Sequence, residues 1–257
     1  NAVGHALHLI DDTLNLNVVN DGQIVVTGLN SYLTGVLTTG PGSSITLRSG
    51  SSGPARLHVS QGFTNHGLIT LMSEEGESGR DASLEVNGVL VNAADGTIRA
   101  AGPEVVVNRY LFVTSVDNRG LIELSEQVLY LGQTGQSTNS GTIRVASGGL
   151  SIHGGGLTNT GNLDIAPGWT VTLAANSGGT FDDSAGTITG GGNLTLGNTT
   201  ALLDAHVELG GLAGDSSTIT LASDLSTATT ALTLRDCTLN GPGTLTVSGN
   251  MNWPAGT

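Results

Sequence analysis

A short unit of turn and strand recurs along the chain and restricts what it can fold into. Each unit begins with Asn or Asp and has at most one further residue before Gly. A short stretch of alternating residues follows, and its second residue after Gly is a branched aliphatic. The copies are Asn20-Asp21-Gly22-Gln23-Ile24, Asn65-His66-Gly67-Leu68-Ile69, Asp95-Gly96-Thr97-Ile98, Asn118-Arg119-Gly120-Leu121-Ile122, Asn139-Ser140-Gly141-Thr142-Ile143, Asn159-Thr160-Gly161-Asn162-Leu163 and, with Ser in the Asn position, Ser184-Ala185-Gly186-Thr187-Ile188. From Gly96 onward the glycines are about 20 to 25 residues apart, a period typical of stacked coils that have no separate cores.

Two sets of short strands are expected between these turns. In the first set, after the turn, one position is always aliphatic: Ile69, Ile98, Ile122, Ile143 and Leu163. A period of two puts these side chains on one face and their neighbours on the other. The second set is expected at residues 56–59, 83–86, 110–113, 128–131, 170–173 and 193–196, with closer strands at 205–209, 218–221, 231–234 and 244–247. Residues 2–10 are interpreted as a strand or a cap.

The repeated turn residues favour a solenoid over a sandwich or barrel of hairpins. Hairpins do not need every second turn to be alike, whereas a solenoid stacks each turn on the one before it. Asn suits the left-handed backbone region, and its side chain can bond the equivalent Asn one winding away. We therefore predict an all-β, single-stranded parallel β-solenoid (β-helix) of roughly 10–12 rungs, each one winding of about 20–25 residues, as one elongated domain over residues 1–257.

Charged residues test this register within the sequence itself. The outward position after the aliphatic residue holds, in successive units, Arg99, Glu123, Arg144 and Asp164. Stacked in register, these side chains alternate in sign along one face, and each lies within reach of the next. Exposed pairs of this kind contribute only about 0.2 to 1 kcal/mol, so the row indicates register rather than stability.

Composition excludes several classes of partner. The net charge is −13, with 21 acidic residues against eight basic ones, and there is no lysine. An acidic chain without a basic stripe is unsuited to nucleic acid or an anionic membrane surface, and no apolar run reaches membrane-spanning length. The single Cys237 excludes an intramolecular disulfide and is interpreted as a small buried side chain.

Two segments depart from the repeat and are expected to be loops, at residues 35–53 and 73–81. The second contains Glu74, Glu75, Glu77 and Asp81, whose oxygens are a candidate calcium site. The spacing matches neither an EF-hand loop nor a calcium-binding nonapeptide, and a solvated acidic loop is the simpler interpretation. No other cofactor is expected.

Aromatic side chains are the candidate carbohydrate contacts. Phe112 and Tyr130 are expected at matching outward positions of consecutive strands, with His58 and Glu85 in the same column. Exposed rings can stack on the apolar faces of sugars, although packing between rungs is the preferred interpretation of such a pair.

Catalysis is not indicated by the carboxylates. The adjacent pairs Asp11-Asp12 and Asp182-Asp183 lie near expected turns, and neighbours in a strand point to opposite faces. A turn-forming role is therefore preferred to paired acid–base chemistry. His5 and His8 are three residues apart and also on opposite faces, which is unsuited to zinc.

The units at residues 63–71 and 157–165 resemble repeats of bacterial secreted β-solenoids, such as filamentous-haemagglutinin-type adhesins and autotransporter passengers, and residues 239–253 resemble repeats of very large bacterial surface proteins. The resemblance is architectural and includes no catalytic or binding motif. It implies an extracellular or cell-surface location and a non-enzymatic structural or adhesive role, as a rigid stalk or a face that contacts a glycan or protein. The alternatives are a carbohydrate-active β-helix enzyme and a segment of a phage tail fibre.

Both ends of the sequence add an expectation. The chain starts at Asn1 without Met, and residues 253–257 contain no polar capping helix. We expect a segment of a larger protein that continues past Thr257, or a second copy stacked there end to end.

Overall fold

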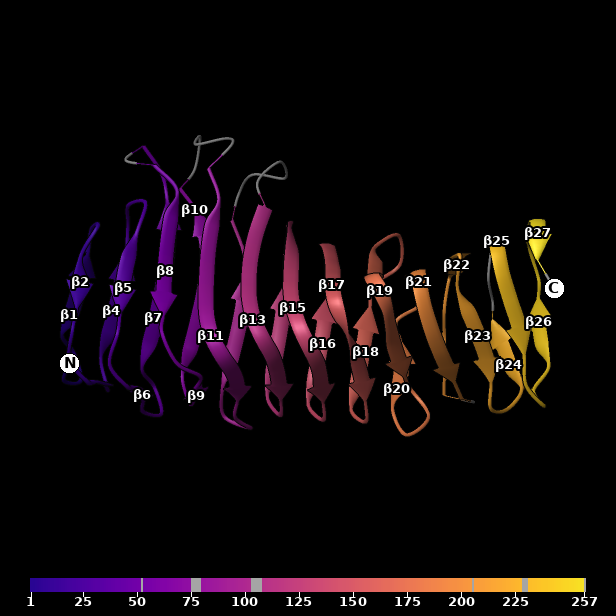
Figure 1. Cartoon of the computed structure of the whole chain (residues 1–257), viewed down its shortest axis with the longest axis horizontal. Coiled ribbons are helices and arrows are strands. Elements are labelled where there is room, and N and C mark those ends of the chain that lie inside the picture. Colours follow the sequence, from indigo (N-terminus) through magenta and orange to yellow (C-terminus); the bar gives the residue numbers. More distant parts are fainter. Residues whose placement is uncertain (52, 75–79, 103–107, 205, 228–230, 257) are drawn as a thin grey trace.

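The chain is built from strands that lie across the long axis of the molecule and are stacked side by side along it (Figure 1). The computed structural model describes residues 1–257 except 52, 75–79, 103–107, 205, 228–230 and 257. The described residues form 27 strands and no helix, and no membrane-spanning helix is therefore found among them.

The first sheet contains the strands that follow the repeated turn. Its nine strands pair in chain order, all parallel, and each belongs to a different winding. They are β1 (Ala6–Leu9), β4 (Gln23–Val26), β7 (Ser44–Ser49), β10 (Leu68–Ser73), β12 (Thr97–Ala100), β14 (Leu121–Leu124), β16 (Thr142–Val145), β18 (Asn162–Ile165) and β20 (Thr187–Thr189).

The second sheet has 14 strands and includes the longest ones. Its strands are β2 (Thr13–Leu14), β5 (Ser31–Leu33), β8 (Ala55–Val59), β9 (Phe63–Asn65), β11 (Ala82–Asn92), β13 (Asn108–Asn118), β15 (Gln127–Asn139), β17 (Gly148–Asn159), β19 (Thr170–Asp182), β21 (Asn193–Leu203), β22 (Gly211–Asp215), β23 (Thr218–Leu221), β25 (Ala231–Asn240) and β27 (Asn250–Gly256). Two small sheets pair β3 (Val18–Asn20) with β6 (Leu37–Thr39), and β24 (Leu225–Thr227) with β26 (Leu245–Val247).

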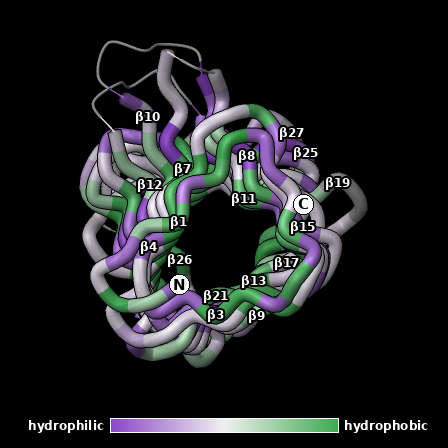
Figure 2. Tube along the Cα trace, turned by 90° about the vertical axis from the view of Figure 1, so that its left-hand side faces the viewer, coloured by the Kyte–Doolittle hydropathy of each residue, from purple (hydrophilic) through white to green (hydrophobic). Residues whose placement is uncertain are grey.

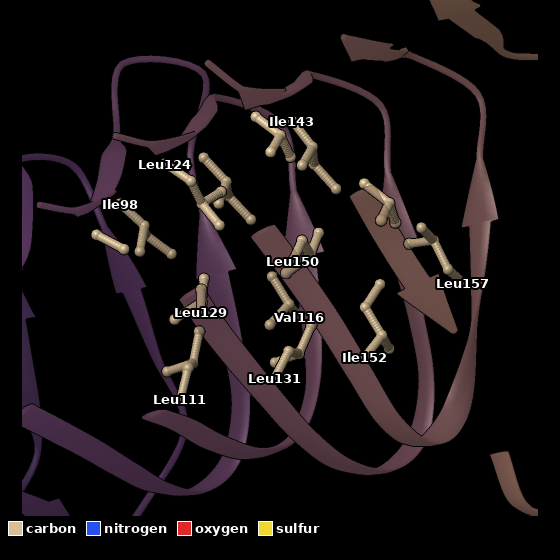
Figure 3. Close-up of a cluster of buried hydrophobic side chains, with 14 of the residues drawn as sticks. Ile98, Leu111, Val116, Leu124, Leu129, Leu131, Ile143, Leu150, Ile152 and Leu157 are labelled. Atoms are coloured by element: carbon tan, nitrogen blue, oxygen red, sulfur yellow. The ribbon is translucent and has the colours of Figure 1, made fainter. Parts of the chain in front are cut away.

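These parallel windings form a β-solenoid of about 11 rungs, as predicted. The end view shows the windings superimposed around one axis, with hydrophobic residues concentrated toward it (Figure 2). The predicted aliphatic column is confirmed, because Ile69, Ile98, Ile122, Ile143 and Leu163 are direct register partners. Side chains from opposite walls meet in the interior, as Ile98, Leu124 and Ile143 do with Leu129 and Leu150 (Figure 3). Cys237 belongs to this core, also as predicted.

A ladder of asparagine side chains runs inside the solenoid at the repeated turn. Asn65 Nδ2 donates to Asn92 Oδ1 at 2.8 Å, and the same bond continues through Asn118, Asn139 and Asn159. All five side chains are buried. The predicted bonding between equivalent asparagines is thus confirmed.

Two members of the ladder differ from the sequence assignment. In the turn that contains Asp95, the ladder residue is Asn92, and in the turn that contains Ser184 it is Asp183. These turns have more residues between the ladder residue and glycine than the Asn-x-Gly turn has, so Asp95 and Ser184 lie outside the ladder. The last side-chain bond runs from Asn159 Nδ2 to Asp183 Oδ1, at 2.6 Å.

The prediction of a loop at residues 35–53 is largely wrong. That segment contains β6 and β7, and its Leu37, Ile45 and Leu47 are buried. It is the winding missing from the sequence repeat, with Thr39 and Ser43 in place of Asn and Gly. Ser43 stacks directly on Gly67 of the next winding, because a Cβ on Gly67 would lie 2.2 Å from Ser43 O. The strand expected at 205–209 is reduced to an isolated bridge between Ile188 and Val207, and residue 205 lies outside the described residues.

Candidate functional site

A groove of about 420 Å³ lies on the outer surface of the second sheet and crosses five rungs. One side is formed by Tyr32 of β5, His58 of β8, Glu85 of β11 and Phe112 of β13, which are successive register partners. These strands are neighbours in the stack (Figure 1), so the groove runs along the solenoid axis.

A second column of small polar residues forms the other side. Thr34, Ser60, Asn87 and Thr114 each follow a residue of the first column by two positions, and Thr134 continues the lining. Residues two apart in a strand share a face, which explains why both columns are outward. The same tripeptide pattern (ring or charge, aliphatic, then Ser, Thr or Asn) occurs four times, at residues 32–34, 58–60, 85–87 and 112–114.

The groove lies where the windings bend. Pairing of β11 with β13 shifts between Val86 and Val89, so Asn87 and Gly88 form a β-bulge in β11. Gly88 has φ of +150°, and a Cβ there would lie 2.4 Å from Gly62 N. Only glycine fits this bulge, which turns the strand beside the groove.

Glu85 is the charged centre of the groove. Its carboxylate contacts His58 Nδ1 at 2.9 Å and Arg56 Nε at 3.4 Å. The His58 ring stacks on Tyr32 with centroids 4.5 Å apart and planes 9° from parallel. The stacking and the contact with Glu85 hold the imidazole in one orientation.

The predicted alignment of Phe112 with Tyr130 is wrong. Tyr130 is the register partner of Tyr110, and Phe112 is the partner of Gly132. The two strands are offset by two residues from the expected register, which keeps every side chain on its predicted face. Phe112 is 42% exposed in the groove, and His58 and Glu85 do share its column as expected.

Tyr130 belongs to an aromatic row beside the groove. The ring centroids are 5.5 Å apart for Phe112 and Tyr110, 5.3 Å for Tyr110 and Tyr130, and 5.8 Å for Tyr130 and His153. Phe112 and Tyr130 are therefore connected through Tyr110, a residue that the sequence interpretation did not single out. Their role in carbohydrate binding stays a prediction.

The acidic segment is only partly within the described residues, since Glu75 and Glu77 lie outside them. Glu74 pairs with Arg48 at 3.3 Å. Burial raises the pKa of Asp81, and nearby Arg109 opposes that rise. Arg109 is itself buried and donates to Ser73 Oγ at 2.8 Å, and burial lowers its pKa to about 10. In the part of the chain that the structure describes, no three His, Cys, Asp or Glu side chains group to hold a metal, and the calcium site stays a prediction.

The paired carboxylates have separate roles. Asp11 accepts a bond from Asn30 N of the next winding at 2.9 Å, whereas Asp12 accepts one from Ile10 N, two residues earlier, at 3.1 Å. Of the two, Asp12 makes the local bond expected of a turn residue. Asp182 similarly accepts a bond from Ser184 N at 3.0 Å. Asp183 begins the expected turn, since its carbonyl accepts a bond from Gly186 N at 3.4 Å, while its side chain is fully buried in the ladder.

A second groove, of about 390 Å³, lies at the repeated turn and is lined in part by Ser43, His66, Asp95 and Arg99. His66 Nδ1 lies 2.9 Å from Asp95 Oδ1, the orientation of a His–Asp pair in a hydrolase triad. The Ser43 hydroxyl is buried and has no hydrogen-bond partner in the structure. The nucleophile–base contact of such a triad is therefore not formed.

The groove residues Tyr32, Thr34, Ser60, Asn87 and Thr114 were not identified from the sequence. The signal that could have found them is the repeated tripeptide, which becomes visible once the second-sheet strands are aligned. Comparisons with protein-family models, with curated proteins and with solved structures found no match to this chain.

Proposed function

We propose that this chain is a non-enzymatic segment of a bacterial surface fibre or secreted adhesin, a rigid rod that presents its groove to a glycan. The stacked ladder and the continuous core make each rung support the next, which suits a stalk. An acidic, lysine-free composition is compatible with an extracellular location and with solubility.

The observation that carries the proposal is the two-sided groove. Rings of Tyr32, His58 and Phe112 lie along one side, and hydroxyl and amide groups lie along the other. Sugars have apolar faces and hydroxyl edges, so they need both kinds of contact at once. Binding sites generally combine an apolar surface with a few placed polar groups in this way.

The same groove argues against a glycoside hydrolase. Such chemistry commonly uses two carboxyl groups across the bond that is cleaved. Among the described residues that line the groove, Glu85 is the one carboxylate, and it is already bound by His58 and Arg56. A carbohydrate-active enzyme remains the alternative, and sugar release is the activity that distinguishes it.

A glycan array probed with the 257-residue chain tests the proposal. We expect retention of a defined set of glycans and about tenfold weaker binding by Phe112→Ala, since a stacked ring contributes roughly 1 to 2 kcal/mol. Trp169→Ala is the matched control, because Trp169 is a similarly exposed aromatic residue outside the groove. Loss of binding in neither variant, or in both equally, contradicts a groove site.

The same glycans are then incubated with the protein and analysed for products. No release of shorter sugars is expected. Release that persists in a purified sample, and that is lost in Glu85→Gln, overturns the non-enzymatic assignment in favour of the enzyme.

A further inference from the structure

We propose further that the groove selects a linear, uncharged glycan that lies parallel to the solenoid axis. The inference rests on the proposed glycan-binding function and specifies the direction and the charge of the ligand. Three features of the described residues support it: the course of the groove, its two unlike sides, and the charges in it.

The course of the groove follows the axis. Tyr32, His58, Glu85 and Phe112 occupy one column, so each lies one rung beyond the last. Rungs are about 4.8 Å apart, and a groove that crosses five of them is therefore roughly 20 Å long. That length fits several consecutive sugars and is too long for one.

The two sides keep the same relation along this length. In four successive rungs the polar residue follows the first-column residue by two positions, as in Tyr32 and Thr34 or Phe112 and Thr114. A glycan that lies along the axis thus has the aromatic column on one side and hydroxyl or amide groups on the other throughout. A glycan perpendicular to the axis contacts only one or two residues of each column.

The charges disfavour an anionic ligand. Among the described residues, the groove lining contains the Glu85 carboxylate and no arginine. Arg56, outside the lining, is paired with Glu85 at 3.4 Å, and a protonated His58 is offset by the same carboxylate. A uronate therefore meets a carboxylate without a free cationic partner, on a chain whose net charge is −13.

Neutral hydroxyls, in contrast, can use these groups. A carboxylate accepts up to four hydrogen bonds, and Glu85 retains acceptor capacity beyond the two cationic contacts. Thr34, Ser60 and Asn87 add further donors and acceptors. An uncharged sugar chain satisfies the groove without burying an unpaired charge.

Calorimetric titration with neutral linear hexose oligomers of increasing length tests the direction. Affinity should rise with each added sugar until the chain spans the groove, and then remain constant. Equal affinity for the shortest and the longest oligomers overturns the axial arrangement.

Titration with uronate oligomers of matched length tests the charge. We expect roughly tenfold weaker binding than for the neutral series, a difference of about 1.4 kcal/mol. Glu85→Gln removes the repulsion between this carboxylate and the uronate and releases Arg56. The difference in affinity between the two series should therefore shrink or reverse. Tighter binding of uronates by the unaltered protein overturns the selectivity but leaves the glycan-binding function standing, whereas failure of both series removes the function as well.

Gly132→Ala probes the shape of the groove without removing any group that contacts the ligand. A Cβ at Gly132 would lie 2.5 Å from Phe112 Cδ1, so the exposed ring must move. We expect several-fold weaker binding of the neutral oligomers with an almost unchanged thermal midpoint, and no change for Trp169→Ala. Unchanged binding in Gly132→Ala contradicts a platform formed by Phe112.

Discussion

Asp183 introduces an ionisable group into a ladder of neutral amides. Asn159 donates to its Oδ1, whereas its Oδ2 is buried without a hydrogen-bond partner. Burial raises the pKa of Asp183 from 3.8 to about 6; Asp182 and Asp204 add to the rise, while the Asn159 bond and His206 oppose it. The folded protein therefore favours the protonated carboxyl more strongly than the unfolded chain does.

The consequence for stability has a definite sign. Because the raised pKa is that of the folded state, the contribution of Asp183 is most favourable below about pH 4 and is lost as the pH rises through about 6. A shift of this size corresponds to at most about 3 kcal/mol. Asp183→Asn keeps an acceptor for Asn159 and removes the charge. We expect it to stabilise the protein by about 1 to 3 kcal/mol at pH 7.5.

Urea unfolding of both proteins at pH 4 and pH 7.5 measures this effect. The gain should be much smaller at pH 4, where the carboxyl is mostly protonated. Asp182→Asn serves as the neighbouring control, since that side chain bonds Ser184 at the surface. A destabilised Asp183→Asn variant at pH 7.5 would show that the ladder needs the ionised group.

A buried side-chain row joins strands of the second sheet, and an exposed row joins strands of the first sheet; the two rows have unequal importance. Inside, Asn118 accepts from Asn92 at 2.8 Å and donates to Asn139 at 2.6 Å. Outside, Arg144 lies 3.1 Å from Asp164 and 4.0 Å from Glu123, which confirms the alternating row predicted from the sequence. Buried hydrogen bonds leave unsatisfied groups when broken, whereas exposed ion pairs are resolvated.

Asn118→Ala should therefore destabilise the protein far more than Arg144→Ala. We expect about 2 to 4 kcal/mol for Asn118→Ala, because Asn139 Oδ1 loses its donor in the core, and less than about 1 kcal/mol for Arg144→Ala. Thermal and urea unfolding monitored by circular dichroism measure both. Similar losses for the two variants would mean that the ladder is not a main source of stability.

The whole molecule is a stack in which each rung is supported by its neighbours. In β14, in the middle, Ile122 and Leu124 are buried, whereas none of the three residues of β26 is buried. Repeat stacks lose their least supported rungs first. We expect backbone amides of β26 to exchange with deuterium at least tenfold faster than those of β14.

Hydrogen exchange followed by mass spectrometry on peptides from both regions tests this expectation. Urea below the unfolding transition should enlarge the exchanging region from β26 toward the centre. Identical rates in β14 and β26 would indicate that the rod opens only as a whole.

Much of the architecture followed from the residues alone. Alternation with a period of two placed Ile69, Ile98 and Ile122 inside, and the repeated Asn and Gly indicated parallel windings, because only stacked turns need the same side chains each time. The alternating charges indicated the same register, and Arg99 does pair with Glu123 at 2.9 Å.

The site depended on tertiary structure, for a physical reason. A slip of two residues leaves every side chain on its own face, so the sequence pattern could not distinguish Tyr110 from Phe112 as the partner of Tyr130. The register of β13 against β15 also includes an irregularity between Val113 and Asp117, which pattern alone does not specify. Because a groove is made by neighbours in different rungs, its columns existed only once that register was set.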